Sequence, residues 1–225
     1  MYLVKKTLII FFALSSIQIS SQYKADMGLS IGSSYYKGDI NPSTPFYSPG
    51  LNFGLSYRYN LNPRYVLKGE VNYLTLSAND ADFTDNYQQR RNASFSSKLY
   101  DFAAQFEFNF LPLKFADRKM SFSPFISSGL SGALAMGSSY SKTFFVALPF
   151  AIGARATIGR KWSVGINWNF RKLFNDKLDG VQNPFPASMG SIWNNNDWYS
   201  YAGLFVTYKM FDFGNNCPAY HENFK

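Results

Sequence analysis

The stretch YDFAAQFEFNF, at residues 100–110, alternates between two kinds of side chain. Even-numbered positions carry Tyr, Phe or Ala, and odd-numbered positions carry Asp, Ala, Gln, Glu or Asn. A repeat of two residues is the period of a β-strand, whose successive side chains point to opposite faces, whereas a helix requires a period of 3.6. We therefore predict a strand here, with one apolar face and one polar face.

The rest of the chain repeats this pattern. Clear alternation is found at residues 25–35, 51–59 and 162–170, and weaker alternation at residues 65–77, 121–136, 144–158 and 198–211. No amphipathic stretch with a credible helix cap accompanies these segments. The sequence thus predicts an all-β fold of eight antiparallel strands.

The connections between the segments differ in length. Residues 60–64 and 159–161 form short connections, and longer ones lie at residues 38–49, 77–94, 111–120 and 173–197. The connection at 137–143 is short where the pattern requires a long one. Long and short connections that alternate on antiparallel strands are typical of outer-membrane β-barrels, with the long loops outside and the short turns in the periplasm. Because the strand number is even, both termini are expected in the periplasm.

A membrane setting reverses the usual direction of the two faces. Strands of about 10 residues span a bilayer when tilted, and the sheet must close because every backbone amide in lipid needs a partner. The apolar face then points outward, and the polar face lines the barrel. The predicted inward face carries nine charged residues: Asp26, Arg58, Lys68, Glu70, Asp101, Glu107, Arg155, Arg171 and Lys209. We expect them to pair inside an eight-stranded barrel that side chains fill, without an open pore.

Aromatic residues fall near the predicted strand ends. Two girdles are expected at the membrane interfaces: Tyr59, Tyr65, Phe110, Trp162 and Tyr208 at the periplasmic ends, and Tyr35, Trp198 and Tyr199 at the outer ends. The competing interpretation is a soluble, lipocalin-like ligand-binding barrel. That barrel requires an apolar interior, and the Gly, Ser, Asn and charged residues of the polar faces favour the membrane interpretation.

The first 22 residues predict a secretory signal peptide. Lys5 and Lys6 precede the apolar run LIIFFAL at residues 8–14, and small and polar residues follow. A spanning helix needs about 20 apolar residues, so a helical membrane protein is excluded. The predicted organisation is a signal peptide at 1–22, a barrel at 23–213 and a periplasmic tail at 214–225.

The composition argues against several kinds of chemistry. One Cys and one His, His221 near the C-terminus, leave no catalytic constellation and no cysteine-based zinc site, so we predict a protein that is not an enzyme and has no cofactor. The net charge is +8, but no Lys/Arg-rich run indicates nucleic acid, and no small-molecule substrate is expected. Asp80, Asp82 and Asp85 resemble no calcium-loop pattern, so salt bridges with Arg90 and Arg91 are favoured over a metal.

Cys217 lies in the predicted tail, next to Pro218. In an oxidising compartment, an unpaired cysteine indicates either a disulfide to another protein or a free thiol. The sequence pattern leaves both readings open.

Several stretches taken together resemble the PorG family of Bacteroidetes outer-membrane proteins. They are SSYYKGDIN (33–41), YRYNLNPRY (57–65), QQRRNASF (88–95), QFEFNFLP (105–112), FSPFISSG (122–129), FNDKLDGV (174–181), DWYSYAGLFVTYK (197–209) and CPAY (217–220). Their order and spacing cover nearly the whole chain after residue 22. The last loop is longer and richer in Asn and Pro than the family pattern.

The resemblance implies a subunit of the type IX secretion system, which exports folded proteins and supports gliding in many relatives. PorG-like barrels are thought to tie a periplasmic ring of a PorK-type lipoprotein and a PorN-type protein to the outer membrane. The resemblance thereby makes Cys217, Pro218 and Tyr220 a candidate docking segment, with Cys217 a candidate for an intermolecular disulfide. The alternative is an OmpA/OmpX-like barrel that acts in adhesion or envelope stability through its outer loops.

Overall fold

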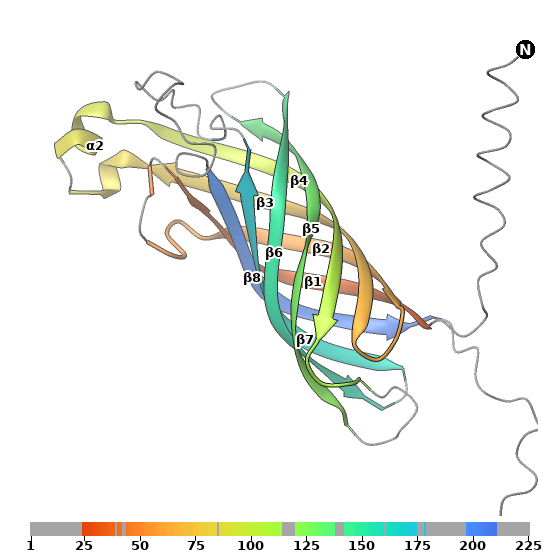
Figure 1. Ribbon diagram of the computed structural model, residues 1–225. Helices are drawn as coiled ribbons and strands as arrows, with labels where there is room; N and C mark the ends of the chain where they lie inside the picture. Colours follow the sequence, from red (N-terminus) through yellow and green to blue (C-terminus); the bar gives the residue numbers. More distant parts are fainter. Residues whose placement is uncertain are drawn as a thin grey trace, which may run out of the picture.

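The computed structural model describes residues 24–38, 40–41, 44–84, 86–113, 120–137, 142–159, 161–174, 178 and 197–210. Eight strands form a closed barrel in chain order, with every neighbouring pair antiparallel (Figure 1). The strands are β1 Lys24–Lys37, β2 Gly50–Asn60, β3 Tyr65–Asn79, β4 Ser94–Asn109, β5 Phe122–Gly137, β6 Lys142–Ile158, β7 Trp162–Leu173 and β8 Trp198–Lys209. The predicted eight-stranded all-β barrel is confirmed.

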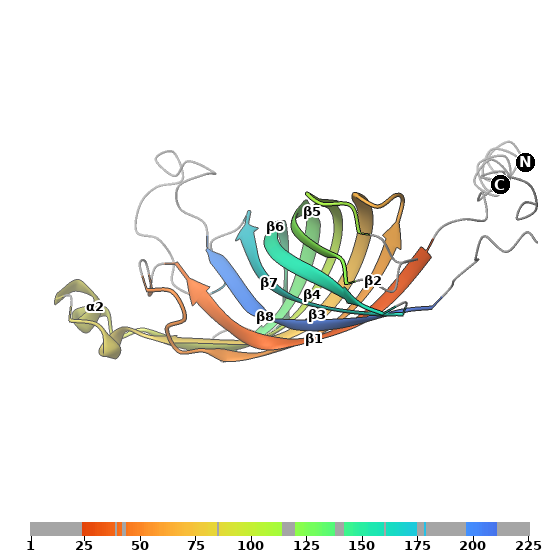
Figure 2. The ribbon, with the colours of Figure 1, turned by 90° about the horizontal axis from the view of Figure 1, so that it is seen from below.

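The barrel closes through β1, which pairs with β2 on one side and with β8 on the other. Met27 stands opposite Tyr57 of β2 and opposite Tyr208 of β8. The Met210 N–H donates to the Ala25 carbonyl at 2.9 Å, just past the end of β8. The start of β1 and the end of β8 therefore lie at one end of the barrel, which is also the end of the short turns (Figure 2).

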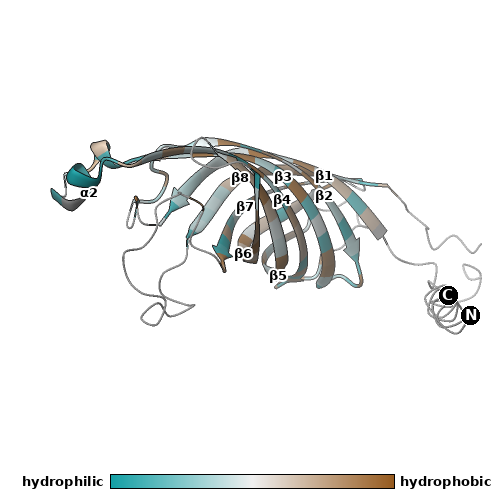
Figure 3. Cartoon of the chain, turned by 90° about the horizontal axis from the view of Figure 1, so that it is seen from above, coloured by the Kyte–Doolittle hydropathy of each residue, from teal (hydrophilic) through white to brown (hydrophobic). Residues whose placement is uncertain are grey.

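The outer wall is apolar around the middle of the barrel. Leu29, Leu204 and Ile166 are 65%, 61% and 57% exposed, respectively. Hydrophobic and hydrophilic residues alternate along the strands when the chain is coloured by hydropathy (Figure 3). A soluble monomer rarely exposes so large a contiguous apolar surface, so the wall is suited to contact with acyl chains. None of the helices in the described ranges has the length and apolarity that a membrane crossing demands.

The connection predicted at residues 77–94 contains helices that the sequence pattern did not predict. A 3₁₀ helix, η1, spans Asp80–Asp82, and an α-helix, α2, spans Asn86–Arg91. The Asn79 side chain accepts a hydrogen bond from the Ala81 N–H and caps η1. A helix of six residues is too short to show the 3.6-residue repeat, which explains why the expectation of no helix is wrong here.

The predicted strand ends also differ from the structure. β4 begins at Ser94 and not at residue 100, β7 continues to Leu173 and not only to residue 170, and β8 ends at Lys209 and not at residue 211. The early part of β4, SFSSKL, has polar side chains on the outward face, so it lacks the alternation used to find a lipid-facing strand. The β3–β4 hairpin thus projects beyond the rest of the wall (Figure 1).

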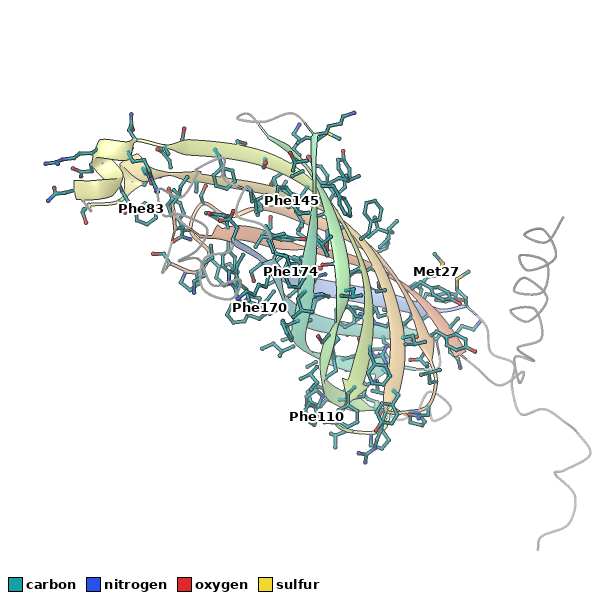
Figure 4. All side chains as sticks on the ribbon, turned by 45° about the horizontal axis from the view of Figure 1, so that its top comes forward. Met27, Phe83, Phe110, Phe145, Phe170 and Phe174 are labelled. Atoms are coloured by element: carbon teal, nitrogen blue, oxygen red, sulfur yellow. The ribbon has the colours of Figure 1, made fainter. Side chains whose placement is uncertain are left out.

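The end of the barrel that carries α2, called the outer part from here on, encloses an apolar core. Buried side chains from β1, β3, β4, β5, β6, β7 and β8 meet there, with Leu74, Leu76, Leu99 and Phe145 at most 1% exposed. Phe145 and Phe83 lie toward the end that carries α2, and Met27 and Phe110 lie at the opposite end (Figure 4). The expectation of a polar interior is therefore wrong for this part. In β3 and β4 the outward side chains here are polar, as in a soluble barrel, whereas Leu134 of β5 and Phe144 of β6 still face outward and are 40% and 59% exposed.

Candidate functional site

The interior below the apolar core holds two groups of charged side chains. The first group joins β1, β2, β4 and β6. Arg155 Nη1 lies 3.5 Å from Asp26 Oδ2, and Arg58 Nε lies 3.5 Å from Glu107 Oε2. Asn60 Nδ2 donates to the same Asp26 oxygen at 3.0 Å. These contacts connect strands on different sides of the barrel across its interior.

Arg58 is also held by packing. Its guanidinium lies over the Phe205 ring of β8, 4.6 Å from the ring centroid, and its Nη1 donates to Ser56 Oγ at 3.0 Å. A guanidinium over an aromatic face gains electrostatic energy in addition to its ion pair. The contact ties β2 to β8, where the neighbouring residues Leu204 and Val206 face outward and are exposed.

The second group is centred on Arg171 of β7. Its Nη2 lies 2.8 Å from Glu70 Oε1 and 3.1 Å from Asp101 Oδ2. Lys68 Nζ lies 2.6 Å from the other Glu70 oxygen. One guanidinium therefore holds two carboxylates from β3 and β4, and Lys68 supplies the second positive charge.

Two tyrosines of β8 complete this second group. Tyr199 Oη donates to Asp101 Oδ1 at 2.9 Å, and Tyr201 Oη contacts both Glu70 and Arg171. Asn72 Nδ2 donates to Tyr201 Oη and to Glu70 Oε1, both at 3.0 Å. Buried charges are costly unless ion pairs and hydrogen bonds surround them, and this group supplies both.

The structure places all nine predicted interior charges inside the barrel. Each is 7% exposed or less, and eight of them form the ion pairs described above; Lys209 is buried at the end of β8, 4% exposed. The sequence pattern did not identify Tyr199, Tyr201 or Asn72 as members. The strand repeat could have identified the two tyrosines: Tyr199 and Tyr201 are odd-numbered like Lys209, so all three lie on the same face of β8.

The predicted girdle at the outer ends of the strands is therefore wrong in part. Tyr199 is fully buried inside the barrel, and Tyr35 faces outward but is 3% exposed because Phe46 covers it, with ring centroids 4.7 Å apart. At the short-turn end, four predicted girdle residues face outward with 37% to 51% exposure: Tyr65, Phe110, Trp162 and Tyr208. Trp198 also lies on an outward-facing position, beside Lys172.

The outer mouth is closed by the apolar core and by a buried hydrogen bond. Tyr36 Oη donates to Asp197 Oδ1 at 2.6 Å, and the Leu178 N–H donates to Asp197 Oδ2 at 3.0 Å. From the short-turn end outward, the described interior thus passes through ion pairs, the Arg171 group and this core. Side chains fill each of these three parts of the interior, as expected for a barrel of eight strands.

The acidic residues of the second outer loop are held by side chains of the same protein. Arg91 binds buried Asp80 through two contacts of 2.7 Å, Nε to Oδ2 and Nη2 to Oδ1, and the Ala93 N–H donates to Oδ2 at 3.0 Å. Burial by itself raises the pKa of Asp80, but these hydrogen bonds outweigh it, and its pKa lies below the usual value. No group of three potential metal-binding side chains occurs among the residues that the structure describes.

Asp82 is bound to the neighbouring loop. Tyr47 Oη donates to Asp82 Oδ2 at 2.5 Å. Burial, and then the hydrogen bond to Asp82, raise the pKa of Tyr47 to about 12. The loop after β1 is therefore attached to the β3–β4 hairpin.

Asp85, Cys217, Pro218, Tyr220 and residues 1–22 lie outside the described residues.

Comparisons with known proteins give a family and similar folds. A family model described as "Domain of unknown function (DUF6089)" matches residues 5–222. No curated protein matches the chain. Among solved structures, Neisserial surface protein A (NspA) is 14% identical with a TM-score of 0.49, covering 85% of this chain and 98% of that chain. Ail, the attachment invasion locus protein of Yersinia pestis, is 13% identical with a TM-score of 0.46, covering 84% and 99%. At these identities the likeness concerns the fold alone.

Proposed function

This chain belongs to the DUF6089 family, and we propose that it is a non-enzymatic anchor in the bacterial outer membrane for the type IX secretion and gliding machinery. In this role, the barrel fixes a periplasmic ring of a PorK-type lipoprotein and a PorN-type subunit to the membrane. The protein holds its partners in place and carries out no turnover.

The observation that carries the proposal is the combination of a lipid-compatible wall with a filled interior. Leu29 and Leu204 are exposed on the outside, while Arg155 and Arg171 are fully buried within. A wall of this kind fits the acyl chains of a bilayer. An interior filled by ion pairs and an apolar core favours a rigid structural role over that of an open channel.

The short-turn end supports a docking role. Two of the stretches that resemble the PorG family meet there, because the Asn109 N–H donates to the Arg64 carbonyl at 2.7 Å and the Leu113 N–H to the Pro63 carbonyl at 3.0 Å. β8 also ends on this side, at Lys209. We assign this end to the periplasm and make Cys217, Pro218 and Tyr220 part of the docking segment.

Non-reducing electrophoresis of cell envelopes tests the partner. The unaltered protein is expected to give a band of higher mass that dithiothreitol removes, and Cys217→Ser is expected to lack that band. The matched control is Ser94→Cys, which places a thiol at the opposite end of the barrel and should leave the Cys217 adduct in place. An adduct that survives Cys217→Ser would remove Cys217 from the interface.

Deletion of residues 214–225 tests the anchor itself. Heat-modifiable gel mobility and outer-membrane fractionation establish whether the shortened barrel still folds and inserts. With insertion intact, the proposal requires the ring subunits to leave the outer-membrane fraction and cargo export to fall. Normal export with the ring still membrane-bound would refute the anchor. Recovery of the unaltered protein in the soluble fraction would instead favour the soluble ligand-binding barrel.

The OmpA/OmpX-like alternative is favoured by one feature, the ordered β3–β4 hairpin that projects beyond the wall (Figure 1). Replacing residues 80–93 with a short Asn-Gly turn separates the two functions. Lost surface adhesion with normal export supports the alternative, and normal adhesion with a normal adduct at Cys217 supports the anchor.

A further inference from the structure

The outward face of β1, β8 and β7 carries an aromatic and basic cluster near the outer mouth. Lys37 of β1 and Lys172 of β7 stand on either side of Trp198 of β8 in the strand register. In the next outward row, Tyr35 and Phe170 stand on either side of Ser200. Phe170 lies nearer the α2 end than Met27 and Phe110 do (Figure 4). The cluster therefore lies at the outer edge of the apolar wall.

A cavity of about 420 Å³ opens within this cluster. Its lining includes the aromatic residues Tyr35, Trp168, Phe170 and Trp198, together with Lys37 and Pro45. The Trp168 Nε1–H donates to Ser200 Oγ at 2.9 Å, which fixes the orientation of one ring. The cavity faces away from the barrel interior, so the buried charges do not account for it.

The loop after β1 folds back over the cavity. Phe46 lies 4.7 Å from Tyr35 and 5.8 Å from Trp168, measured between ring centroids. Phe46 and Ser48 have φ angles of +57° and +46°, which non-glycine residues adopt infrequently. Tyr47, between them, is held by Asp82 and by the Asn79 backbone. Contacts to the β3–β4 hairpin thus hold Phe46 in place over the wall.

Lys37 gives the cavity lining a positive charge and is exposed. Lys172, which is 7% exposed, lies outside the lining, with its Nζ 5.0 Å from the centroid of the Trp198 ring. Among the described residues, the cavity lining contains no Asp or Glu. Below it, the wall continues through Ile31, Leu204 and Ile166, which face each other across β1, β8 and β7. A cationic margin above an apolar strip matches an anionic headgroup with attached acyl chains.

We propose that this cluster is a binding site for a phosphorylated lipid of the outer leaflet, with lipid A as the representative chemistry. The Lys37 ammonium binds a headgroup phosphate, the aromatic rings pack against the headgroup sugar, and an acyl chain lies along Ile31 and Leu204. The inference depends on the proposed outer-membrane location and is independent of the anchor's partners.

Native mass spectrometry tests the site with the full protein extracted from outer membranes and exchanged into phosphatidylcholine nanodiscs. Three probes are compared: diphosphorylated lipid A, the same lipid after phosphate removal, and inorganic phosphate. The unaltered protein is expected to retain diphosphorylated lipid A at least about tenfold better than the dephosphorylated form, the factor typical of one charge-assisted contact. Inorganic phosphate is expected not to displace it.

Lys37→Gln removes the charge and is expected to lower lipid A retention about tenfold. Phe46→Ala opens the cavity and is expected to lower it as well. Lys98→Gln is the matched control, because Lys98 is an exposed lysine near the outer end of β4, away from the cavity. Heat-modifiable mobility verifies that each variant is folded.

Three results would overturn the site: equal retention of the phosphorylated and dephosphorylated lipids, displacement by inorganic phosphate, or equal effects of Lys37→Gln and Lys98→Gln. The Cys217 adduct is measured on the same variants. If the unaltered protein forms the adduct but retains phosphorylated and dephosphorylated lipid A equally, the lipid site fails and the anchor stands. If selectivity holds while deletion of residues 214–225 leaves export normal and the ring membrane-bound, the anchor fails and the lipid site stands.

Discussion

In β3 and β4, the inner and outer parts of the barrel place apolar side chains on opposite sides of the same wall. In the inner part of β3, Val71 faces outward and Glu70 is buried inside. Further along that strand, Leu76 is buried inside and the polar Ser77 faces the other way. β4 changes in parallel: Phe102 is exposed in the inner part, whereas Phe95 is buried in the outer part.

The strand period is the same in both parts, so the reversal in β3 and β4 reflects the medium that surrounds each part. The proposed lipid around the inner part makes apolar outward residues favourable and leaves the interior to ion pairs. Water around the end of the β3–β4 hairpin restores the arrangement of a soluble barrel in these two strands, whereas Phe144 and Val146 of β6 stay exposed on the outward face. Tyr73 and Tyr100 meet between the two parts, with ring centroids 5.4 Å apart. Tyrosine at this level fits the membrane–water interface.

The largest effect is expected from Arg171→Met, in the charged interior. The substitution leaves Glu70 and Asp101 buried without their shared cation, so the free energy of unfolding is expected to fall by about 3–5 kcal/mol. Urea unfolding of the barrel in phospholipid vesicles measures it. Arg64→Met, in an exposed turn, is the control and is expected to change stability by less than about 0.5 kcal/mol. Equal small losses for both would mean that the Arg171 group does not hold the inner part together.

The outer core is expected to behave like the core of a soluble protein. Leu76→Ala removes a side chain that is 1% exposed and is expected to cost about 2–5 kcal/mol by leaving a cavity. Leu204→Ala makes the same change on the exposed wall, where acyl chains fill the space that is left, so its cost is expected to be well below that of Leu76→Ala. The same urea titration applies. A larger loss for Leu204→Ala would contradict the distinction between the two parts.

Lysine substitutions on the outward face locate the boundary. Val71→Lys places a charge against the proposed lipid and is expected to destabilise the barrel by about 2–4 kcal/mol, the cost of a lysine near the bilayer midplane. Ser94→Lys, at the exposed start of β4, is expected to cost about 0–1 kcal/mol, as near the interface. Both are measured in vesicles. A cost of about 2–4 kcal/mol at both positions would place residue 94 inside the membrane, and a cost of about 0–1 kcal/mol at both would place Val71 outside it.

Much of the inner part was predictable from local pattern. Alternation alone assigned Asp101 and Glu107 to the inward face of β4, and the same rule applied to Arg58, Lys68 and Arg155. The pattern could not show which charges meet, because Arg171 reaches Glu70 from strands far apart in the sequence. The pattern search also assumed a lipid-facing outer side along the entire strand, so the predicted strand begins at residue 100 and omits residues 94–99 of β4.

The outer part was less predictable for physical reasons that particular residues illustrate. Tyr199 was expected in a girdle because aromatic residues are common there, but its parity and its bond to Asp101 place it inside. Phe46 covers Tyr35 through a loop conformation that no strand repeat encodes. α2 depends on contacts between loops. Long-range contacts and a change of solvent thus determine the features that alternation did not reveal.

The smallest expected effect is a pH dependence confined to the outer loops. Asp80 has a lowered pKa in the folded loop, so its contribution to stability is complete above the unfolded value, about 3.9, and is lost as pH falls through the folded value. Because charged hydrogen bonds contribute about 1.5–3 kcal/mol, local opening of residues 79–93 is expected to become progressively easier as pH falls below about 4, by at most that amount. Hydrogen exchange, corrected for its intrinsic pH dependence, measures this. Asp80→Asn should abolish the pH dependence in the loop and leave the inner strands unchanged. If the inner strands lose protection over the same range, the acid response belongs to the interior carboxylates and the two parts are coupled.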